Sequence, residues 1–298
     1  MTEEEKEITP GEPQKKEPKN FGTSETITWC RGCGNFGIMV ALKNAFAQLG
    51  WGPEDVLIVY GIGCHGHMIN YLSNYGFEGL HGRALPVATG AKIANNKLNV
   101  IVIAGDGDQF SEGGNHFIHA ARKNIDITCI IHDNQVYALT VGQSSPTSQK
   151  GFKTKTNPMG VFENPVHPLT LALACEASFV GRGFSGDVKH LTDLLVQAIQ
   201  HKGFSLVDVF QPCVTFNYLN TFKWFYEKIY KLEEVGHNKT DKMAAYAKAL
   251  EEDKLPTGIF YQEEKLTFED QLPQLEEKTL VDQPIDNIDI ERLLIEFS

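Results

Sequence analysis

Residues 100–108, VIVIAGDGD, combine a short apolar run with a turn rich in glycine and aspartate. The same arrangement recurs at 56–60 (VLIVY), 127–131 (ITCII) and 204–210 (FSLVDVF). Each run is rich in β-branched residues and apolar on both faces, which is typical of parallel strands covered by helices on both sides. These segments therefore predict the strands of one parallel sheet.

Helical patterns lie between the predicted strands. Residues 36–49 carry apolar side chains at spacings of three and four and end at Gly50, and 112–123 form a second helical segment. A third covers 187–201, with Asp187 as its N-cap. Alternating strands and helices predict an α/β domain, a parallel sheet with helices on both faces.

Four chemically reactive side chains follow the predicted strands. Ligands of open α/β sheets bind beyond the carboxyl ends of the strands. We therefore expect Cys64, Asp106, Asn134 and Cys213 to converge on one edge of the sheet although they lie far apart in the sequence.

Composition and charge divide the 298 residues into three regions. The net charge of −11 argues against a nucleic-acid partner. Residues 1–20 are charged, contain three prolines and predict a disordered leader, and 21–235 form the α/β domain, which includes an amphipathic helix over 217–233. Residues 236–298 form an acidic C-terminal extension, helical near 240–252 and then extended, which is either solvated or packed on a partner.

Neither a membrane-spanning run nor a secretory signal is recognisable, so we expect a cytoplasmic protein without a membrane partner.

The turn after residue 104 and the end of the next strand predict a site for a magnesium-bound diphosphate. Mg²⁺ prefers oxygen ligands and takes one or two from protein side chains. Asp106 offers a carboxylate, Asn134 an amide oxygen 28 residues later, and Val136 a backbone carbonyl. Gly105 and Gly107 allow close approach of the backbone to the phosphates. This arrangement resembles the thiamine-diphosphate motif.

Cysteine usage leaves three interpretations open. Cys30 and Cys33 form the motif WCRGC, whereas Cys64 and Cys213 stand alone in turns. The set is compatible with a thioredoxin-type dithiol, a four-cysteine zinc site or a 4Fe–4S cluster held by one CxxC pair and two remote thiolates. Two further cysteines lie in apolar runs and are interpreted as buried core residues, namely Cys129 and Cys175.

Six histidines give the impression of a metal cluster: His65, His67, His81, His116, His119 and His132. Most are better interpreted as turn or helix-face residues with ordinary hydrogen bonds. We expect His81, and less firmly His65, to donate to phosphate or substrate. Arg83 is compatible with either an anion contact or a structural role.

Six motifs together resemble the β subunit of 2-oxoacid:ferredoxin oxidoreductases. They are, in order, WCRGCGN, YGIGCHGH, HGRALPVATGAK, GDGDQFSEGGNHFIHAARKN, HDNQVYALTVGQSSPTS and FQPCVTFN. The resemblance implies a thiamine-diphosphate-binding fold with a 4Fe–4S cluster on Cys30, Cys33, Cys64 and Cys213, and with Mg²⁺ on Asp106, Asn134 and the Val136 carbonyl. It also implies a set of cofactor-binding residues, namely Ile62, Gly63, Cys64, His65, His81, Gly107, Asp108, Leu139 and Thr140.

The resemblance implies oxidative decarboxylation of a 2-oxoacid with coenzyme A, and electrons that pass through the cluster to ferredoxin. Such enzymes use a glutamate on a separate domain, so we expect this chain to need an α or fused γα subunit. Val141 replaces a lysine of some broad-range members, which leaves the choice among pyruvate, 2-oxoglutarate and other acids open. A thiamine-dependent decarboxylase without a cluster and a zinc-stapled scaffold remain the alternatives.

Overall fold

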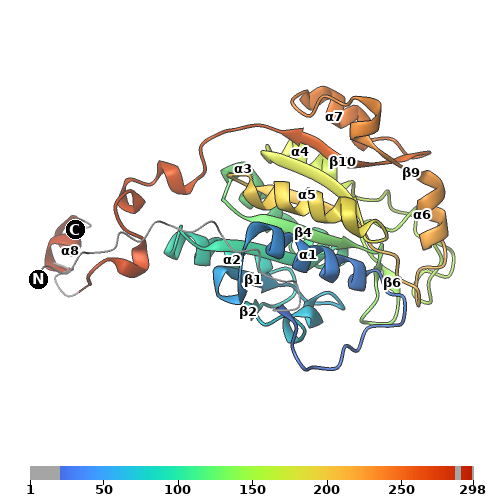
Figure 1. Ribbon diagram of the computed structural model, residues 1–298, viewed down its shortest axis with the longest axis horizontal. Coiled ribbons are helices and arrows are strands. Elements are labelled where there is room, and N and C mark those ends of the chain that lie inside the picture. Colours follow the sequence, from blue (N-terminus) through green and yellow to red (C-terminus); the bar gives the residue numbers. More distant parts are fainter. Residues whose placement is uncertain (1–20, 286–289, 297–298) are drawn as a thin grey trace, which may run out of the picture.

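The computed structural model describes residues 21–285 and 290–296. The predicted leader, 1–20, lies outside the described residues. Eight strands form one sheet in the order β2–β1–β3–β4–β8–β7–β10–β9 (Figure 1). The strands are β1 (Val56–Tyr60), β2 (Tyr75–Glu78), β3 (Asn99–Gly105), β4 (Thr128–Asp133), β7 (Phe179–Phe184), β8 (Ser205–Phe210), β9 (Ile229–Lys231) and β10 (Leu255–Gln262).

Helices cover both faces of this sheet. One face packs on α1 (Asn35–Leu49) and α5 (Val188–Gln200), and the other on α2 (Ala84–Ala94), α3 (Gly114–Lys123), α4 (Pro168–Ala174) and α7 (Lys242–Ala249). Strand β3 shows why its sequence is apolar throughout. Ile101 and Ile103 belong to the core under α1 and α5, whereas Val100 and Val102 belong to the opposite core. The predicted fold class is confirmed.

The helix ends follow the residues that the sequence offers for capping. Helix α1 ends at Gly50, which adopts a left-handed conformation with φ of 72°. The side chain of Asp187 accepts a hydrogen bond from the backbone N–H of His190 and caps α5.

Two features differ from the sequence prediction. The single helix expected over 217–233 is wrong, because the only α-helical part of this range is α6 (Phe222–Lys228). Strand β9 follows it directly, and a short 3₁₀ helix then begins at Leu232. The backbone of β9 pairs in parallel with β10, and this long-range pairing replaces the last helical turns. Strand β10 itself pairs antiparallel with β7, so the sheet continues beyond the domain boundary expected at residue 235.

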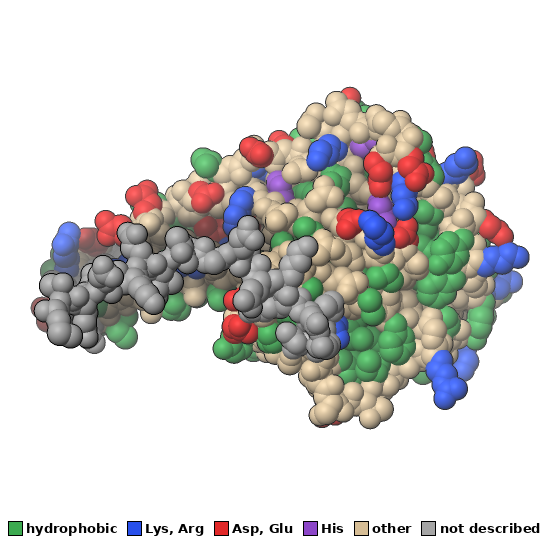
Figure 2. Space-filling view, in the orientation of Figure 1, with side chains coloured by type: hydrophobic (Ala, Val, Ile, Leu, Met, Phe, Trp, Pro, Cys, Tyr) green, Lys and Arg blue, Asp and Glu red, His purple; other side chains and the backbone are tan. Residues whose placement is uncertain are grey.

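Beyond β10 the chain leaves the sheet and runs away from it (Figure 1). Its first part remains attached, because the Nδ2 of Asn124 donates to the carbonyl of Leu266 over 3.1 Å. Acidic side chains are spread along the visible face of this arm rather than gathered in one patch (Figure 2). Within the described residues, none of the helices has the length and apolar character needed to cross a membrane.

Candidate functional site

Asp106 and Asn134 lie side by side at the carboxyl edge of the sheet. They follow the neighbouring strands β3 and β4, whose last paired residues are Gly105 and His132. The backbone N–H of Asn134 donates to the buried Asp106 carboxyl. The spatial relationship expected from the sequence is therefore present.

A cavity of about 70 Å³ opens beside these two residues. Every residue predicted to bind the cofactor or Mg²⁺ lines it, and Gly105, Tyr137 and Ala138 line it too. Tyr137 and Ala138 were not predicted. They belong to a small hairpin of β5 (Val136–Tyr137) and β6 (Gln143–Ser144), whose two-residue strands are too short to give a periodic signal.

Among the residues that the structure describes, the carboxyl of Asp106 is held by neutral hydrogen-bond donors and by no cationic side chain. Thr147 Oγ1 lies 2.6 Å from its Oδ2, and the Ser145 hydroxyl also donates to it. Burial raises the pKa of Asp106 to about 6, while both hydroxyls oppose that rise. The amide oxygen of Asn134 accepts from the N–H of Val136 over 3.0 Å and retains a second lone pair. This oxygen set fits a divalent cation shared with a diphosphate.

Asp108 ties three loops together around the cavity. Its Oδ1 accepts the backbone N–H of Gly82 at 2.8 Å and of Ile62 at 3.2 Å, and lies 2.9 Å from Nδ1 of His81. The His81 ring is thereby fixed at the cavity wall, as a phosphate donor would need to be. Asp108 contributes by holding these loops in place.

Close packing explains the glycines of the GDG turn. A Cβ at Gly107 would lie 2.4 Å from the Tyr137 ring, and one at Gly105 would lie 2.7 Å from the His65 ring. The sequence led us to expect phosphate in this space. In the structure the two rings fill it, so glycine is required by the protein's own packing.

Three of the remaining histidines have the ordinary hydrogen bonds that the sequence suggested, whereas His67 lines a cavity together with the predicted cluster cysteines. His132, His116 and His119 have ordinary partners: Asn35 at 2.8 Å, Arg83 at 2.8 Å and Arg122 at 2.9 Å. Arg83 is thus engaged with a neutral partner. Burial, aided by His81 and His67, lowers the pKa of His65 to about 3, which keeps this cavity-lining ring uncharged near neutrality.

The four predicted cluster cysteines line a second cavity, of about 100 Å³. Cys30 and Cys33 precede α1, Cys64 follows β1, and Cys213 follows β8. Neither of the two cysteines expected in the core lines this cavity. Cys129 is buried as expected, whereas Cys175 is only partly buried.

Packing and hydrogen bonds bring the cysteine loops together. The N–H of Gly34 donates to the carbonyl of Pro212 over 3.2 Å, and a Cβ at Gly34 would lie 2.7 Å from the Ser185 hydroxyl. Trp29 Nε1 donates to the Cys64 carbonyl over 2.6 Å. Gln211 Nε2 lies 3.4 Å from Cys33 Sγ and donates to the sulfur.

Within this group, neighbouring thiols affect the pKa values of Cys33 and Cys64. Burial first, and then the neighbouring thiols, raise the pKa of Cys33 to about 12 and that of Cys64 to about 11. Grouped thiolates therefore need a positively charged group to offset their burial. Among the residues that the structure describes, no three His, Cys, Asp or Glu side chains are arranged around a single metal ion. Zinc ions and iron–sulfur clusters both take thiolate ligands, so the four cysteines that line this cavity fit such a group.

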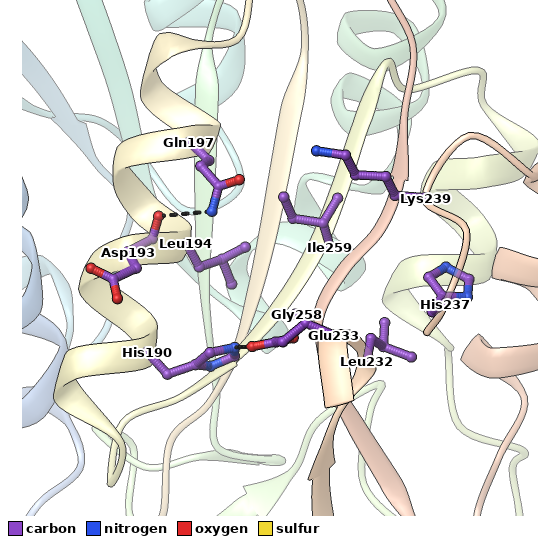
Figure 3. Close-up of a pocket in the computed structure, with 10 residues that line it drawn as sticks. All are labelled: His190, Asp193, Leu194, Gln197, Leu232, Glu233, His237, Lys239, Gly258 and Ile259. Atoms are coloured by element: carbon purple, nitrogen blue, oxygen red, sulfur yellow. Dashed lines mark hydrogen bonds and ion pairs between the residues drawn. The ribbon is translucent and has the colours of Figure 1, made fainter. Parts of the chain in front are cut away.

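The two cavities are direct neighbours. Cys64, Asn134, Ala138 and Leu139 line both of them. Another cavity, of about 360 Å³, lies between α5 and β10 and contains none of the predicted residues (Figure 3). It is crossed by an ion pair in which His190 Nε2 lies 2.9 Å from Glu233, which joins α5 to the segment after β9.

The fold and the cavity at Asp106 define a thiamine-diphosphate-binding domain. Residues 61–209 match the family described as thiamine pyrophosphate enzyme, C-terminal TPP binding domain. Residues 213–277 match the family that describes the C terminal part of the pyruvate ferredoxin oxidoreductase beta subunit. The second match spans β10, in agreement with its place in the sheet.

Similar proteins specify the family further. The chain is 42% identical to a 2-oxoacid:ferredoxin oxidoreductase subunit beta of Saccharolobus solfataricus, over 87% of this chain and 90% of that one. It is 44% identical to the 2-oxoglutarate oxidoreductase subunit KorB of Mycobacterium tuberculosis, over 70% and 56% of the two chains. A solved 2-oxoglutarate:ferredoxin oxidoreductase from Magnetococcus marinus, with 2-oxoglutarate, coenzyme A and succinyl-CoA bound, superposes with a TM-score of 0.87 at 36% identity, over 95% and 96% of the chains. The chain belongs to the β subunits of 2-oxoacid:ferredoxin oxidoreductases.

Proposed function

We propose that this chain holds thiamine diphosphate, Mg²⁺ and a 4Fe–4S cluster and takes part in coenzyme A-dependent oxidative decarboxylation of a 2-oxoacid. The products are acyl-CoA, CO₂ and reduced ferredoxin. One observation carries the proposal: the cavity beside Asp106 and the cysteine cavity share Cys64 and Asn134. An electron acceptor at the cysteines would therefore adjoin the cofactor directly.

The oxygen ligands of the first cavity have defined roles in this proposal. Asp106, Asn134 and the carbonyl of Val136 hold Mg²⁺, and His81 donates to the diphosphate. Thr147 and Ser145 fix the Asp106 carboxylate, and Asp108 holds the His81 loop. When bound, thiamine diphosphate supplies the electron sink for decarboxylation and the cluster supplies a one-electron acceptor.

The four cysteines act as cluster ligands. Cys30, Cys33, Cys64 and Cys213 hold the irons, while the Gln211 amide donates to the Cys33 sulfur. Hydrogen bonds to cluster sulfurs raise the reduction potential. The burial of Cys213 limits access of water to that side of the cavity.

In this proposal the site is completed by a second polypeptide. Among the described residues no glutamate lines the cavity beside Asp106, so the glutamate that activates the aminopyrimidine has to come from elsewhere. We propose an α or fused γα subunit as its source. The names of the relatives support a 2-oxoacid substrate and include 2-oxoglutarate.

The complete complex and the isolated chain should be assayed side by side with pyruvate, 2-oxoglutarate and a branched-chain 2-oxoacid. Ferredoxin reduction should require coenzyme A and both subunits. Calorimetry with thiamine diphosphate and Mg²⁺ provides a readout that does not depend on turnover. Robust turnover by the isolated chain would refute the need for a partner.

A further inference from the structure

We propose that a third cavity at the carboxyl edge is a binding site for a small carboxylic acid that also carries a hydroxyl or amino group. This cavity measures about 620 Å³, within the usual range of small-molecule sites. It lies beyond the ends of β4 and β8, and it shares no lining residue with the cavity at Asp106 or the cysteine cavity. Its lining is therefore distinct from theirs, although it adjoins the proposed magnesium site through Thr147, which lines this cavity and donates to Asp106.

The sheet register aligns three charged side chains on one face. Ile131 of β4 pairs with Asp208 of β8, and Asp208 pairs with Arg182 of β7. Asp133 lies two residues beyond Ile131 and so points to the same face. Of these three charged residues, Asp133 and Arg182 line the cavity, and Asp208 lies behind them.

Arg182 presents an unused hydrogen-bonding surface. Its side chain is 8% exposed, and its Nε donates to Asp208 over 3.0 Å. The guanidinium lies over the ring of Phe210 at 4.6 Å and that of Phe260 at 5.7 Å, which fixes its plane. Within the described part of the chain neither Nη atom has a hydrogen-bond partner. Two parallel N–H groups of this kind match a carboxylate in bidentate geometry.

Asp133 supplies the second contact. The residue is 3% exposed, and its Oδ1 accepts from Thr147 over 2.9 Å. Its Oδ2 has no hydrogen-bond partner among the described residues and is not sealed from the cavity. Burial, and then the nearby Asp208 and Asp106, raise the pKa of this carboxyl well above its ordinary value. A hydroxyl or amino group on the ligand can both donate and accept, so it would satisfy this oxygen in either charge state of Asp133.

The residues at the rim of this cavity determine its shape more than its affinity for a charged ligand. Trp224 and Lys228 line one side, with the Lys228 Nζ 4.9 Å from the Trp224 ring centre. Lys150 also lines the rim, but Glu251, Glu252 and Asp253 offset both lysines. The buried Arg182 and Asp133 therefore determine which ligands fit.

Calorimetry with L-malate and succinate tests the proposal, because the two acids differ only by one hydroxyl group. The full chain and its complex with the partner subunit should both bind L-malate, and succinate should bind about tenfold more weakly. Arg182→Lys keeps the ion pair with Asp208 but removes the bidentate fork, and should weaken L-malate binding by about tenfold or more. Arg122→Lys, the same exchange at an exposed position on α3, is the matched control and should leave binding unchanged.

Three results would overturn the proposal. Equal binding of L-malate and succinate would remove the role of Asp133. Equal binding by the Arg182→Lys and Arg122→Lys variants, with both melting cooperatively, would place the ligand elsewhere. Loss of binding in the complex, with an acidic side chain of the partner seated on Arg182, would identify the cavity as part of the interface between the two polypeptides.

Discussion

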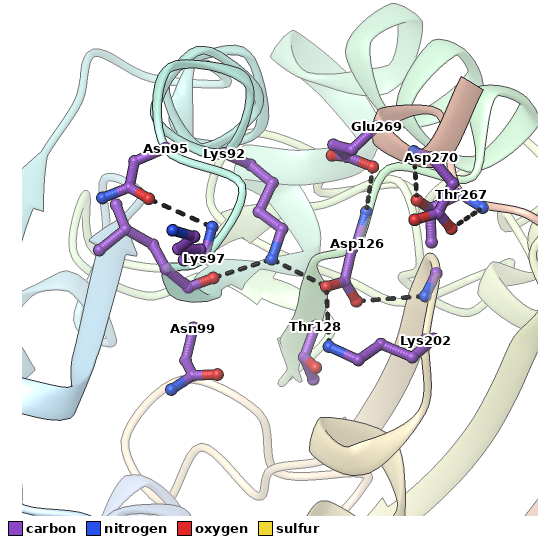
Figure 4. Close-up of polar contacts among 12 residues, drawn as sticks. Lys92, Asn95, Lys97, Asn99, Asp126, Thr128, Lys202, Thr267, Glu269 and Asp270 are labelled. Carbon is purple, nitrogen blue, oxygen red and sulfur yellow. Dashed lines mark hydrogen bonds and ion pairs between the residues drawn. The ribbon is translucent and has the colours of Figure 1, made fainter. Parts of the chain in front are cut away.

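The two edges of the sheet use buried charge in opposite ways. At the amino edge, the buried Lys92 ammonium lies 2.8 Å from Asp126 and donates to the Leu98 carbonyl (Figure 4). Asp126 also pairs with Lys202 at 3.4 Å and accepts the N–H of Gly203. Each charged side chain in this group of three has an opposite charge beside it.

At the carboxyl edge, the buried groups around the proposed cofactor sites are left incomplete. Among the described residues, Asp106 has hydroxyl and backbone donors but no cationic side chain beside it, and Cys33 lies beside three other thiols. Buried charge without a counter-charge is costly, and a ligand can offset that cost. The edge with satisfied charges therefore stabilises the fold, whereas the edge with unsatisfied groups is suited to binding ligands.

Removal of one charge from the amino edge should have the largest effect on stability. Lys92→Met leaves the partly buried Asp126 beside only the exposed Lys202, so the free energy of unfolding should fall by about 3 kcal/mol. Urea denaturation monitored by circular dichroism measures this loss. Thiamine diphosphate affinity of the folded fraction should be unaffected, and a parallel loss of affinity would contradict the division between the edges.

A substitution at Asp106 should have the opposite effects: a loss of cofactor affinity without a loss of stability. Asp106→Asn removes the only carboxylate of the proposed Mg²⁺ site, and affinity for Mg²⁺ with thiamine diphosphate should fall by about 100-fold. Unfolding free energy should stay the same or rise, because the variant no longer buries an unpaired acid. Calorimetry and urea denaturation separate the two effects. Unchanged affinity would show that the cofactor lies elsewhere.

Thr147→Val keeps the Asp106 carboxylate and removes one of the groups that hold it. The variant loses the hydroxyl 2.6 Å from Asp106 Oδ2, and cofactor affinity should drop by about tenfold. Thr154→Val, outside the cavity linings, is the matched control. If both variants bind the cofactor equally well, the hydroxyl has no positioning role.

Acid should weaken the amino edge. Burial alone would raise the pKa of Asp126, but Lys92 and Lys202 outweigh it and hold that pKa below its ordinary value. Its stabilising contribution is therefore complete above the unfolded-state pKa of about 4 and is lost as the pH falls through the lower native value. The stability gap between the wild type and Lys92→Met should narrow below pH ~4 in thermal melts. If the difference in stability between the two proteins does not change with pH, the Lys92–Asp126 pair contributes through packing alone.

Lys202→Met should have the smallest effect. Its side chain is 80% exposed and lies 3.4 Å from Asp126, so water screens the pair. The expected loss is below about 1 kcal/mol by urea denaturation. A loss as large as that of Lys92→Met would mean that burial does not govern the strength of this cluster.

Local patterns predicted the central strands and the residues at their carboxyl ends. β3 could be recognised because both of its faces are buried, and Asp106 and Asn134 because each follows such a strand. β7 was missed, since Gly181, Arg182 and Gly183 interrupt its apolar run. β9 and β10 depend on pairing between distant segments, which no local period reveals.

Site residues could likewise be predicted where a local sequence pattern locates them, and not where long-range pairing does. Each residue expected in the cavity at Asp106 lines it, because a motif and a strand end locate it. The alignment of Asp133 with Arg182 was not predictable, because it requires the register of β4, β8 and β7, whose order in the sheet differs from their order in the sequence.

The proposed enzyme depends on four distant thiolates that hold one iron–sulfur cluster beside the cofactor cavity. Iron and acid-labile sulfide should be counted in anaerobically purified wild-type, Cys64→Ser and Cys129→Ser proteins, together with absorbance near ~400 nm. We expect about four irons and four sulfides in the wild type and in Cys129→Ser, and a large loss in Cys64→Ser. A colourless wild type carrying zinc, or the same iron content in all three proteins, would contradict this assignment.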